Sequence, residues 1–441
     1  MNLGFMDPGL RKARFFLHIR SRLEPDIRCF YFSRRRAVRS WIKSAGCTAY
    51  PRSAAPRSPL RRYTDEELLR AIGPKEAALR RTKSLRLARE LLTQLSHFLD
   101  TCEIDSLLVW NGSNLQLSLA IFLARQRGIS IIFAEHGYLP DTMQLDLKGV
   151  NHASSLTDEV VKGRAKLQSD PKIDAQLDKV LSCFKSGHPP RVIVTTPPEC
   201  YRTDAVSRVQ HYINARFKDW YRARLWREGH AMGLDAKALP ERFVLVPLQV
   251  QKDSQLILHS PLIGNDLRRL LALVERAAGM VDATLRVVVK LHPQEQPHVQ
   301  KRHLRLLSEF PRITFVSKPP MRDLLPHASA IVTVNSTVGF EAFLYDKPVV
   351  TLGRNFYTSP HLVEPVTSEQ HLPAALTRAL SEPVDIEQRR AFLRFVHSRF
   401  LVSGTYRDYS EESQLAVAHR VRELLAKAAE SRDSRPMCGL G

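Results

Sequence analysis

Short apolar segments alternate with segments of helical periodicity along most of the chain. Residues 106–110 and 129–134 are apolar runs, and between them apolar positions recur with helical spacing over residues 114–127. A second series of apolar runs follows, separated by helical periodicity, at residues 243–248, 285–291, 313–316, 330–334 and 348–352. Strands that alternate with helices are typical of parallel sheets covered by helices. The pattern therefore predicts an α/β fold.

The two series of strands predict two domains. With 441 residues and 44% hydrophobic composition, the chain is long and apolar enough to bury two cores. We expect a first α/β domain over residues 1–200, a charged helical connection over 201–240 and a second α/β domain over 241–385. Helical periodicity then predicts C-terminal helices over residues 386–430. The polar residues 431–441 are expected to form a disordered tail.

The first 62 residues are strongly basic. They hold 15 Lys and Arg against 3 Asp and Glu, which is more than half of the net charge of +21. Phe15, Phe16, Phe30 and Phe32 are interleaved with these charges, which predicts a short strand and a helix. Such a segment suits docking on an anionic lipid surface. The alternative is that the aromatic side chains belong to the core and the arginines to a solvated face.

Several classes of protein are disfavoured by what the sequence lacks. Its six cysteines lie far apart, without the close pairs of a zinc site or a disulfide framework. No apolar stretch approaches the roughly 20 residues that span a bilayer, and no signal peptide is recognisable. P-loop, zinc-protease and α/β-hydrolase motifs are absent. We therefore expect a protein of the reducing cytoplasm without a metal site.

Polar residues follow both strands of the first series. Asn111 comes directly after the first strand, at a helix start that could meet an anion; the alternative is an ordinary turn with a helix cap. Glu135 and Gly137 follow the second strand, and Asp146 lies in the polar loop beyond them. A carboxylate at a strand end can act as an acid or a base, or orient an acceptor. The alternative is that Glu135 only caps the following turn.

The first strand of the second series also ends in polar residues. Gln249, Gln251 and Asp253 follow it directly. In an α/β protein this position lies at the edge of the sheet where ligands bind, so these side chains are candidate ligand-binding groups. The alternative is a solvated loop in which Asp253 caps the next helix.

Two further strand ends carry groups that suit a phosphate. Lys290 and His292 end the second strand of this series, and the proline after His292 stops the strand. Ser336 and Thr337 follow a later strand and begin a helix, where hydroxyls and backbone N–H groups are available. An ordinary helix cap would use the same two residues. Because both sites lie at strand ends of one domain, we expect them to share a phosphate.

Five segments form an ordered set along the chain: EHG, QLDLKGVN, VPLQVQKD, KLHP and NSTVGFEA, at residues 135–137, 144–151, 246–253, 290–293 and 335–342. This set resembles the bacterial capsule polysaccharide biosynthesis family. Within that family, YFSRRR at residues 31–36 and WNG at residues 110–112 are most similar to the lipid-linker initiating β-Kdo transferases, where Kdo is 3-deoxy-manno-octulosonic acid. The resemblance covers residues 15–400.

The resemblance implies a GT-B-like glycosyltransferase, with two Rossmann-like domains facing across a cleft. The N-terminal domain would bind the acceptor, an anionic lipid of the phosphatidylglycerol type. The C-terminal domain would bind the nucleotide-sugar donor CMP-Kdo, with no other cofactor. The implied protein is cytoplasmic and peripheral at the inner membrane, with other capsule assembly proteins as further partners and no nucleic acid.

The resemblance also implies roles for single residues. Lys290 and His292 match the phosphate-binding His-Pro motif, and Ser336 and Thr337 match a second phosphate-contacting turn. Asp253 matches the aspartate that acts as nucleophile in a retaining double displacement. Gln249 and Gln251 are assigned to the donor. On the acceptor side, Glu135 matches the acidic residue of an E-x-G motif, with His136 where many relatives carry Asp or Asn; the other acceptor-side candidates are Asn111, Gly137 and Asp146.

Rival interpretations remain open. Another GT-B envelope transferase, such as a polyol-phosphate transferase with a CDP-activated donor, would bind its phosphate through the same His-Pro motif. A non-catalytic accessory of capsule export would share the family motifs without activity. A nucleic-acid-binding protein would explain the basic N-terminus, but no nucleic-acid motif accompanies the charge.

Overall fold

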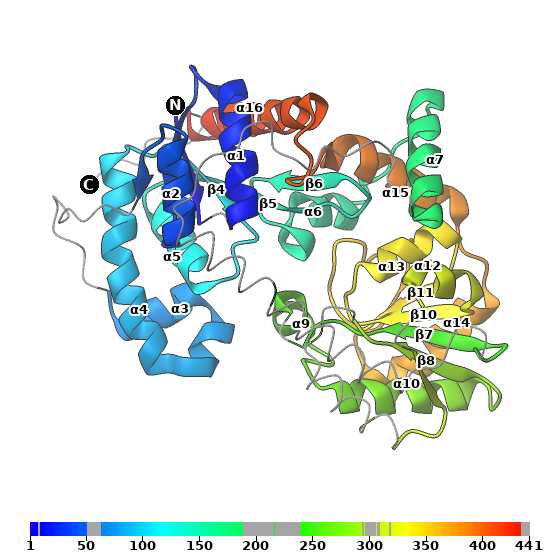
Figure 1. Ribbon diagram of the computed structural model, residues 1–441. Coiled ribbons are helices and arrows are strands. Elements are labelled where there is room, and N and C mark those ends of the chain that lie inside the picture. Colours follow the sequence, from blue (N-terminus) through cyan, green and yellow to red (C-terminus); the bar gives the residue numbers. More distant parts are fainter. Residues whose placement is uncertain are drawn as a thin grey trace. The chain divides into compact units, whose positions relative to one another are not determined.

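The chain forms two compact units, each built on its own sheet (Figure 1). The computed structural model describes residues 1–7, 9–50, 63–187, 216, 239–251, 253–292, 295, 306, 309–316 and 319–433. Within these, unit 1 contains the residues up to Ser155 and those from Phe400 onward. Unit 2 contains Leu156 to Arg399. Both sheets are covered by helices and consist mainly of parallel strands, which confirms the α/β class with two Rossmann-like units.

The sheet of unit 1 has seven strands in the order β13-β6-β5-β4-β1-β2-β3. The first five strands in the sequence pair in parallel, whereas β6 pairs antiparallel with both β5 and β13. Their bounds are β1 Asn2–Met6, β2 Arg28–Phe32, β3 Ala49–Tyr50, β4 Ser106–Trp110, β5 Ser130–His136, β6 Thr142–Asp146 and β13 Leu401–Ser403.

Helices cover both faces of this sheet. One core contains Phe15, Val38 and Val417 from three helices, α1 Leu10–Leu23, α2 Arg36–Ser44 and α16 Glu411–Asp433. A second core contains Leu68, Leu95 and Leu119 from α3 Asp65–Ile72, α4 Pro74–Thr101 and α5 Leu115–Gln126. Since β4 packs against helices on both faces, all five of its residues are buried, which explains its continuous apolar sequence.

The sheet of unit 2 has six parallel strands in the order β12-β11-β10-β7-β8-β9. Its strands are β7 Phe243–Pro247, β8 Arg286–Lys290, β9 Ile313–Val316, β10 Ala330–Thr333, β11 Val349–Thr351 and β12 Glu364–Pro365. The described helices are α6 Ser155–Val161, α7 Pro171–Ser186, α9 Ser254–His259, α10 Leu267–Val281, α12 Met321–Leu324, α13 Val338–Glu341, α14 Leu372–Ser381 and α15 Ile386–Phe395. The five strands predicted for the second series are confirmed to within two residues at either end.

The N-terminal segment contains more structure than its sequence pattern predicts. Instead of one short strand and one helix, it forms β1, α1, β2, α2 and β3, and β1 lies between β4 and β2 in the sheet. Beyond it, α3 begins with a capping box: Thr64 accepts the N–H of Glu67, whose side chain accepts the N–H of Thr64. The polar stretch expected to be a loop contains the strand β6.

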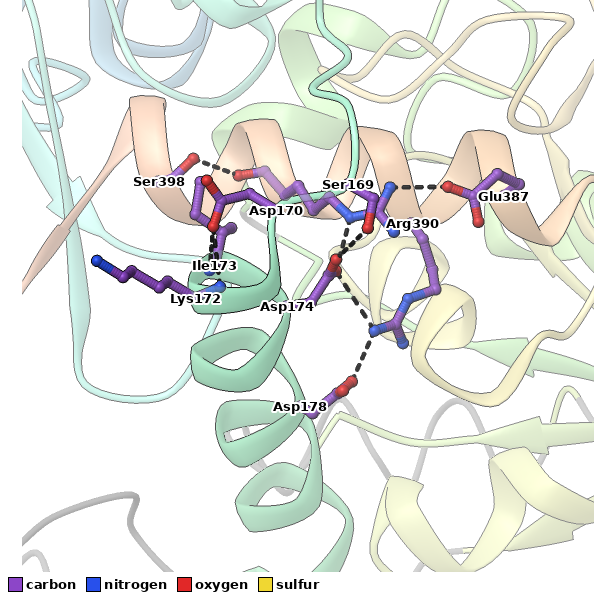
Figure 2. Close-up of polar contacts among 10 residues, drawn as sticks. Ser169, Asp170, Lys172, Ile173, Asp174, Asp178, Glu387, Arg390 and Ser398 are labelled. Atoms are coloured by element: carbon purple, nitrogen blue, oxygen red, sulfur yellow. Dashed lines mark hydrogen bonds and ion pairs between the residues drawn. The ribbon is translucent and has the colours of Figure 1, made fainter.

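The chain passes between the two units at places that differ from the predicted boundaries. α7 lies within residues 1–200 but belongs to unit 2, where it packs on α15. Arg394 of α15 forms ion pairs with Asp174 at 2.6 Å and Glu387 at 2.8 Å, and Arg390 contacts Asp178 at 2.7 Å (Figure 2). Asp174 and Arg394 lie 220 residues apart, and Asp178 and Arg390 lie 212 apart, which explains why the periodicity of either helix gave no sign of the contact between α7 and α15.

The C-terminal helix belongs to unit 1 rather than to a separate C-terminal segment. α16 packs on α1, and β13 extends the sheet beside β6 (Figure 1). α16 also reaches Asp433, so the expected tail begins later than residue 431. Residues 434–441 lie outside the described residues, as does nearly all of the predicted connection at 201–240.

The aromatic residues of the basic N-terminus are part of the core. Phe15, Phe16 and Phe32 are at most 1% exposed, and Phe5 packs between Phe16 and Tyr31. The prediction that these three aromatics reach a lipid surface is therefore wrong, because they fix α1 and β2 to the sheet, whereas Phe30 is only half-buried. The charged residues Arg34, Arg35 and Arg36 are exposed, as the alternative interpretation requires. Over the described residues, none of the helices has the length and apolarity to cross a membrane.

Candidate functional site

The polar residues predicted in the second half of the chain gather at one edge of the unit 2 sheet. β8, β7 and β10 are parallel neighbours, so the residues after them lie side by side. Gln249 Nε2 donates to Asn335 Oδ1 at 2.9 Å, and the backbone N–H of Asn335 donates to Gln249 Oε1 at 3.3 Å. This amide pair joins the segments that follow β7 and β10.

Asp253 is the N-cap of α9. Its Oδ1 accepts the backbone N–H of Gln255 at 2.9 Å, so the capping alternative is confirmed for this oxygen. Asn335 Nδ2 donates to the backbone oxygen of Gln255 at 2.8 Å, which ties α9 to the segment after β10. Asp253 is only half-buried, and its second carboxylate oxygen has no hydrogen bond within the described part of the chain. One oxygen is structural and the other is available for chemistry.

Lys290 and His292 lie at the end of β8 in a poorly solvated environment. Lys290 is 6% exposed, and burial lowers its pKa to about 8. Burial also lowers the pKa of His292; Asp253 and Glu295 oppose this effect, and Lys290 adds to it. The imidazole is therefore neutral at pH 7, where it can donate one hydrogen bond from a ring N–H. Since Asp253 acts on the pKa of His292, a carboxylate lies near the predicted phosphate-binding group.

The segment after β10 is held rigidly. Ser336 is buried, its Oγ accepts the N–H of Val338 at 3.2 Å, and Tyr357 Oη donates to its backbone oxygen. A Cβ on Gly339 would lie 2.1 Å from Tyr357 Oη, so only glycine allows this approach. Thr337 is exposed. The structure thus brings Ser336 close to the edge shared by Asp253 and His292, but occupies its hydroxyl with a backbone contact.

A cavity of about 700 Å³ lies next to these residues in unit 2. Leu248, Leu256 and Ile263 form apolar walls, and Gln249, Gln251 and Asn265 contribute polar groups. Of the candidates for donor binding, only Gln249 and Gln251 line it. The cavity therefore adjoins the end of β7 without containing Asp253, Lys290 or His292.

The acceptor-side candidates of unit 1 surround Glu135. Its carboxylate accepts hydrogen bonds from Trp110 Nε1 at 3.2 Å, Asn111 Nδ2 at 2.6 Å and its neighbour's backbone N–H at 2.9 Å. Asn111 adopts a positive φ of 64°, a conformation in which Asn is common. Glu135 is therefore fixed by the end of β4 and does not merely cap a turn. The helix cap expected after Asn111 is provided by Asn114, which accepts the N–H of Leu117.

Two other acceptor-side candidates have structural roles in this unit. Gly137 lies against Thr142 of β6, and any Cβ would meet Thr142 Oγ1 at 1.9 Å. Asp146 is 3% exposed, and its Oδ1 accepts the N–H groups of Lys148 at 2.7 Å and Gly149 at 3.1 Å. Its other oxygen accepts the hydroxyl of Ser155. The carboxylate of Asp146 holds the turn after β6.

Sequence reasoning missed two residues that contact this group. Lys12 Nζ lies 3.8 Å from the centroid of the Trp110 ring, a cation–π contact. Tyr406 packs edge-on against Trp110, with ring centroids 5.1 Å apart. Lys12 could have been noted as a lysine in the first turn of a predicted helix, but nothing in the sequence brings Tyr406 to β4. Among the described residues, no group of three His, Cys, Asp or Glu could hold a metal ion.

Comparison with known proteins places these motifs in context. Residues 105–405 match the family described as capsule polysaccharide biosynthesis protein. Protein FixF of Sinorhizobium fredii is 28% identical over 344 residues, which cover 78% of this chain and 71% of FixF. Capsule polysaccharide export protein KpsS of Escherichia coli is 31% identical over 268 residues, which cover 56% of this chain and 66% of KpsS.

Solved structures with a similar course of the chain include glycosyltransferase domains. The β-Kdo 2,7 transferase of Thermosulfurimonas dismutans KpsC has a TM-score of 0.42 and 16% sequence identity, and the match covers 75% of this chain and 89% of that one. Its β-Kdo 2,4 transferase has a TM-score of 0.43 and 15% identity, with 68% and 81% covered. The family match over residues 105–405 includes β4, β5 and the whole described sheet of unit 2. This chain therefore belongs to the capsule polysaccharide biosynthesis protein family.

Proposed function

We propose that this protein is a glycosyltransferase that moves Kdo from CMP-Kdo to a lipid acceptor of the phosphatidylglycerol type, which begins the linker of a capsule polysaccharide. Family membership supports a role in capsule polysaccharide synthesis. The proposal includes a cytoplasmic enzyme that is peripheral at the inner membrane, because both the nucleotide-sugar and the head group of such a lipid are available there.

One observation supports the chemistry most directly. Asp253 and His292 follow neighbouring parallel strands, and the charge of Asp253 acts on the pKa of His292. Departure of CMP from Kdo passes through an oxocarbenium-like transition state, which requires a carboxylate near the anomeric carbon and donors near the leaving phosphate. A carboxylate next to a phosphate-binding imidazole meets both requirements.

The residues of unit 2 divide this work in the proposal. Lys290 supplies positive charge to the phosphate, and His292 donates a hydrogen bond to it. The oxygen of Asp253 that is not used by the α9 cap attacks the anomeric carbon, and the C–O bond to CMP breaks. The acceptor hydroxyl then displaces Asp253 and restores the original anomeric configuration. Ser336 and its rigid turn position the phosphate, while Gln249 and Gln251 contact the rest of the donor.

Glu135 has the acceptor role in unit 1. Three hydrogen-bond donors fix its carboxylate, so it presents one orientation to an incoming hydroxyl. It either accepts the hydroxyl proton or orients the hydroxyl for attack. Asn111 is a positioning residue, since its amide reaches the acceptor only through Glu135.

The test is a transfer assay with purified protein. The protein is incubated with a CMP-Kdo generating system and a phosphatidylglycerol analogue, and mass spectrometry identifies the products. We expect a lipid that is heavier by one or more Kdo residues, together with free CMP. Parallel reactions with CDP-glycerol separate the rival polyol-phosphate transferase. Transfer from CDP-glycerol but not from CMP-Kdo, or from neither, would reject the proposal.

A further inference from the structure

Three basic side chains of unit 1 gather at the carboxyl end of its parallel strands. Lys12 lies in the first turn of α1, which follows β1. A Cβ built on Gly9, the residue before α1, would lie 3.6 Å from Arg35 Nη1, which places the Arg35 guanidinium beside the start of this helix. Arg407 Nε donates to Tyr406 Oη at 3.3 Å, and Tyr406 lies under Lys12 at 5.4 Å from its ring centroid.

These cations have no carboxylate partner within 4.0 Å among the described residues. Other described arginines of unit 1 do form ion pairs, such as Arg34 with Glu90 and Arg22 with Glu411. Burial lowers the pKa of Lys12 to about 8; Glu135 raises it, whereas Arg35 and Arg407 lower it further. The repulsive contributions of Arg35 and Arg407 agree with the geometry, which places Arg35 beside the start of α1 and Arg407 on the ring of Tyr406 next to Lys12. An anion between the three would remove this repulsion.

Glu135, the carboxylate that acts on the pKa of Lys12, cannot neutralise the cluster well. Both oxygens of Glu135 accept hydrogen bonds from Trp110, Asn111 and a backbone N–H, so they are directed toward β4. Trp110, His136 and Tyr406 pack against one another, with ring centroids 5.1 to 5.3 Å apart, and form an aromatic wall beneath Lys12. The wall fixes the position of Lys12, since its ammonium lies 3.8 Å above the Trp110 ring.

We propose that Lys12, Arg35 and Arg407 form a phosphate-binding site in unit 1, separate from the donor site of unit 2. The ligand is a phosphate ester, whose oxygens accept hydrogen bonds from both guanidinium groups and the ammonium. Its ester-linked carbon chain lies along the aromatic wall. If the proposed function holds, this phosphate is that of the lipid acceptor, close to Glu135. The phosphate chemistry is the same for a lipid head group and for a free phosphorylated metabolite.

Titration calorimetry with sn-glycerol 3-phosphate tests the site. The wild type is expected to bind this probe and not glycerol. Arg407→Gln and Lys12→Gln should each weaken binding by about tenfold or more, the effect of losing one charge-assisted contact. Arg407 is exposed, so its variant has little packing to lose. Lys43→Gln is the matched control. It removes one exposed charge in the last turn of α2, whereas Arg35 lies just before the first turn, and it should leave the affinity within about twofold.

Two further comparisons identify the site and the source of the phosphate. His292→Ala should not change the affinity for sn-glycerol 3-phosphate; a loss would place the probe in unit 2 and overturn the proposal. Sedimentation with phosphatidylglycerol and phosphatidylcholine vesicles follows. If Arg407→Gln weakens binding to phosphatidylglycerol vesicles as well as to the soluble probe, and not to phosphatidylcholine vesicles, the phosphate belongs to a lipid head group. If it weakens binding of the soluble probe but not of the vesicles, the ligand is a free phosphorylated metabolite.

The site and the proposed function can fail separately. Probe binding that depends on Lys12 and Arg407, in a protein that does not transfer Kdo, would support the phosphate site and reject the transferase proposal. No binding of sn-glycerol 3-phosphate by the wild type at about 10 mM, or equal binding by Arg407→Gln and Lys12→Gln, would overturn the site.

Discussion

Gln249 and Asn335 lie 86 residues apart and are joined by two hydrogen bonds. The side-chain amide of Gln249 donates to Asn335 Oδ1 and accepts the backbone N–H of Asn335. Asn335 also donates to backbone oxygens of Gln255 and His259, at 2.8 and 3.3 Å. A single amide therefore connects the segment after β7, the helix α9 and the segment after β10. Because Asp253 is the cap of α9, this connection fixes where its carboxylate lies relative to Ser336.

Replacing Gln249 by Leu is expected to destabilise unit 2. Asn335 is 6% exposed, so its Oδ1 and backbone N–H would be left without their partner away from water. Such a loss costs about 1 to 3 kcal/mol of the free energy of unfolding. Urea unfolding measures it. Gln251→Leu is the control, because the side chain of Gln251 makes no hydrogen bond with the described residues; an equal loss in both variants would contradict the role of the amide pair.

Two substitutions of Asp253 separate its capping role from its proposed catalytic role. Asn retains an oxygen that can accept the N–H of Gln255, whereas Ala removes the cap. Asp253→Asn should keep wild-type stability and CMP affinity and lose transfer by at least about a thousandfold, as expected for a nucleophile. Asp253→Ala should lose activity equally and about 1 kcal/mol of stability in addition. If Asp253→Asn retains more than about a tenth of the wild-type rate, this residue is not the nucleophile.

Elements that are both short and strongly apolar could be predicted from the sequence. β4 and β10 are predicted correctly because buried parallel strands have uninterrupted apolar runs. β1 was missed because Asn2 and Gly4 interrupt its pattern. Gly4 is required for packing, since a Cβ there would lie 2.8 Å from Leu107 Cδ2. The glycine that weakens the strand pattern in the sequence is thus the residue that allows close contact between β1 and β4.

Contacts between distant segments account for what the sequence could not predict. β13 pairs with β6 across more than 250 residues, and each strand is too short for its own pattern to be distinctive. In the candidate site, the position of Asp253 at a strand end was predictable from the rule that ligands bind there. The contact of Tyr406 with Trp110 was not, because it depends on the return of the chain to unit 1 after residue 400.

His292→Ala is expected to weaken CMP binding by about tenfold or more. The imidazole is half-buried and neutral at pH 7, so the variant removes one hydrogen bond to phosphate, worth about 1.5 to 3 kcal/mol. Titration calorimetry with CMP measures the change. His371→Ala, at the start of α14, is a control in the same unit that should bind CMP like the wild type. If His292→Ala binds CMP with unchanged affinity, the nucleotide binds at another part of the protein.

The buried ammonium of Lys290 should affect CMP binding and folding stability in opposite directions as the pH rises. Burial lowers the pKa of Lys290 from 10.5 to about 8, so in the free protein the ammonium is charged at pH 7 and mostly neutral at pH 9. CMP affinity should therefore fall as the pH rises through about 8. Between pH 8 and 10.5 the unfolded chain binds more protons at this residue than the folded one, so its contribution to folding stability rises with pH.

Calorimetry with CMP from pH 7 to 9, in parallel with thermal unfolding, tests both signs. Lys290→Arg keeps its charge throughout this range, so its CMP affinity should not change with pH. Lys290→Met should bind CMP weakly at every pH, and its unfolding should lose the part of the pH dependence that belongs to Lys290. His292 is already neutral over this interval, because burial lowers its pKa, and it cannot produce the same profile. A wild-type CMP affinity that is constant from pH 7 to 9 would mean that Lys290 does not bind the phosphate of CMP.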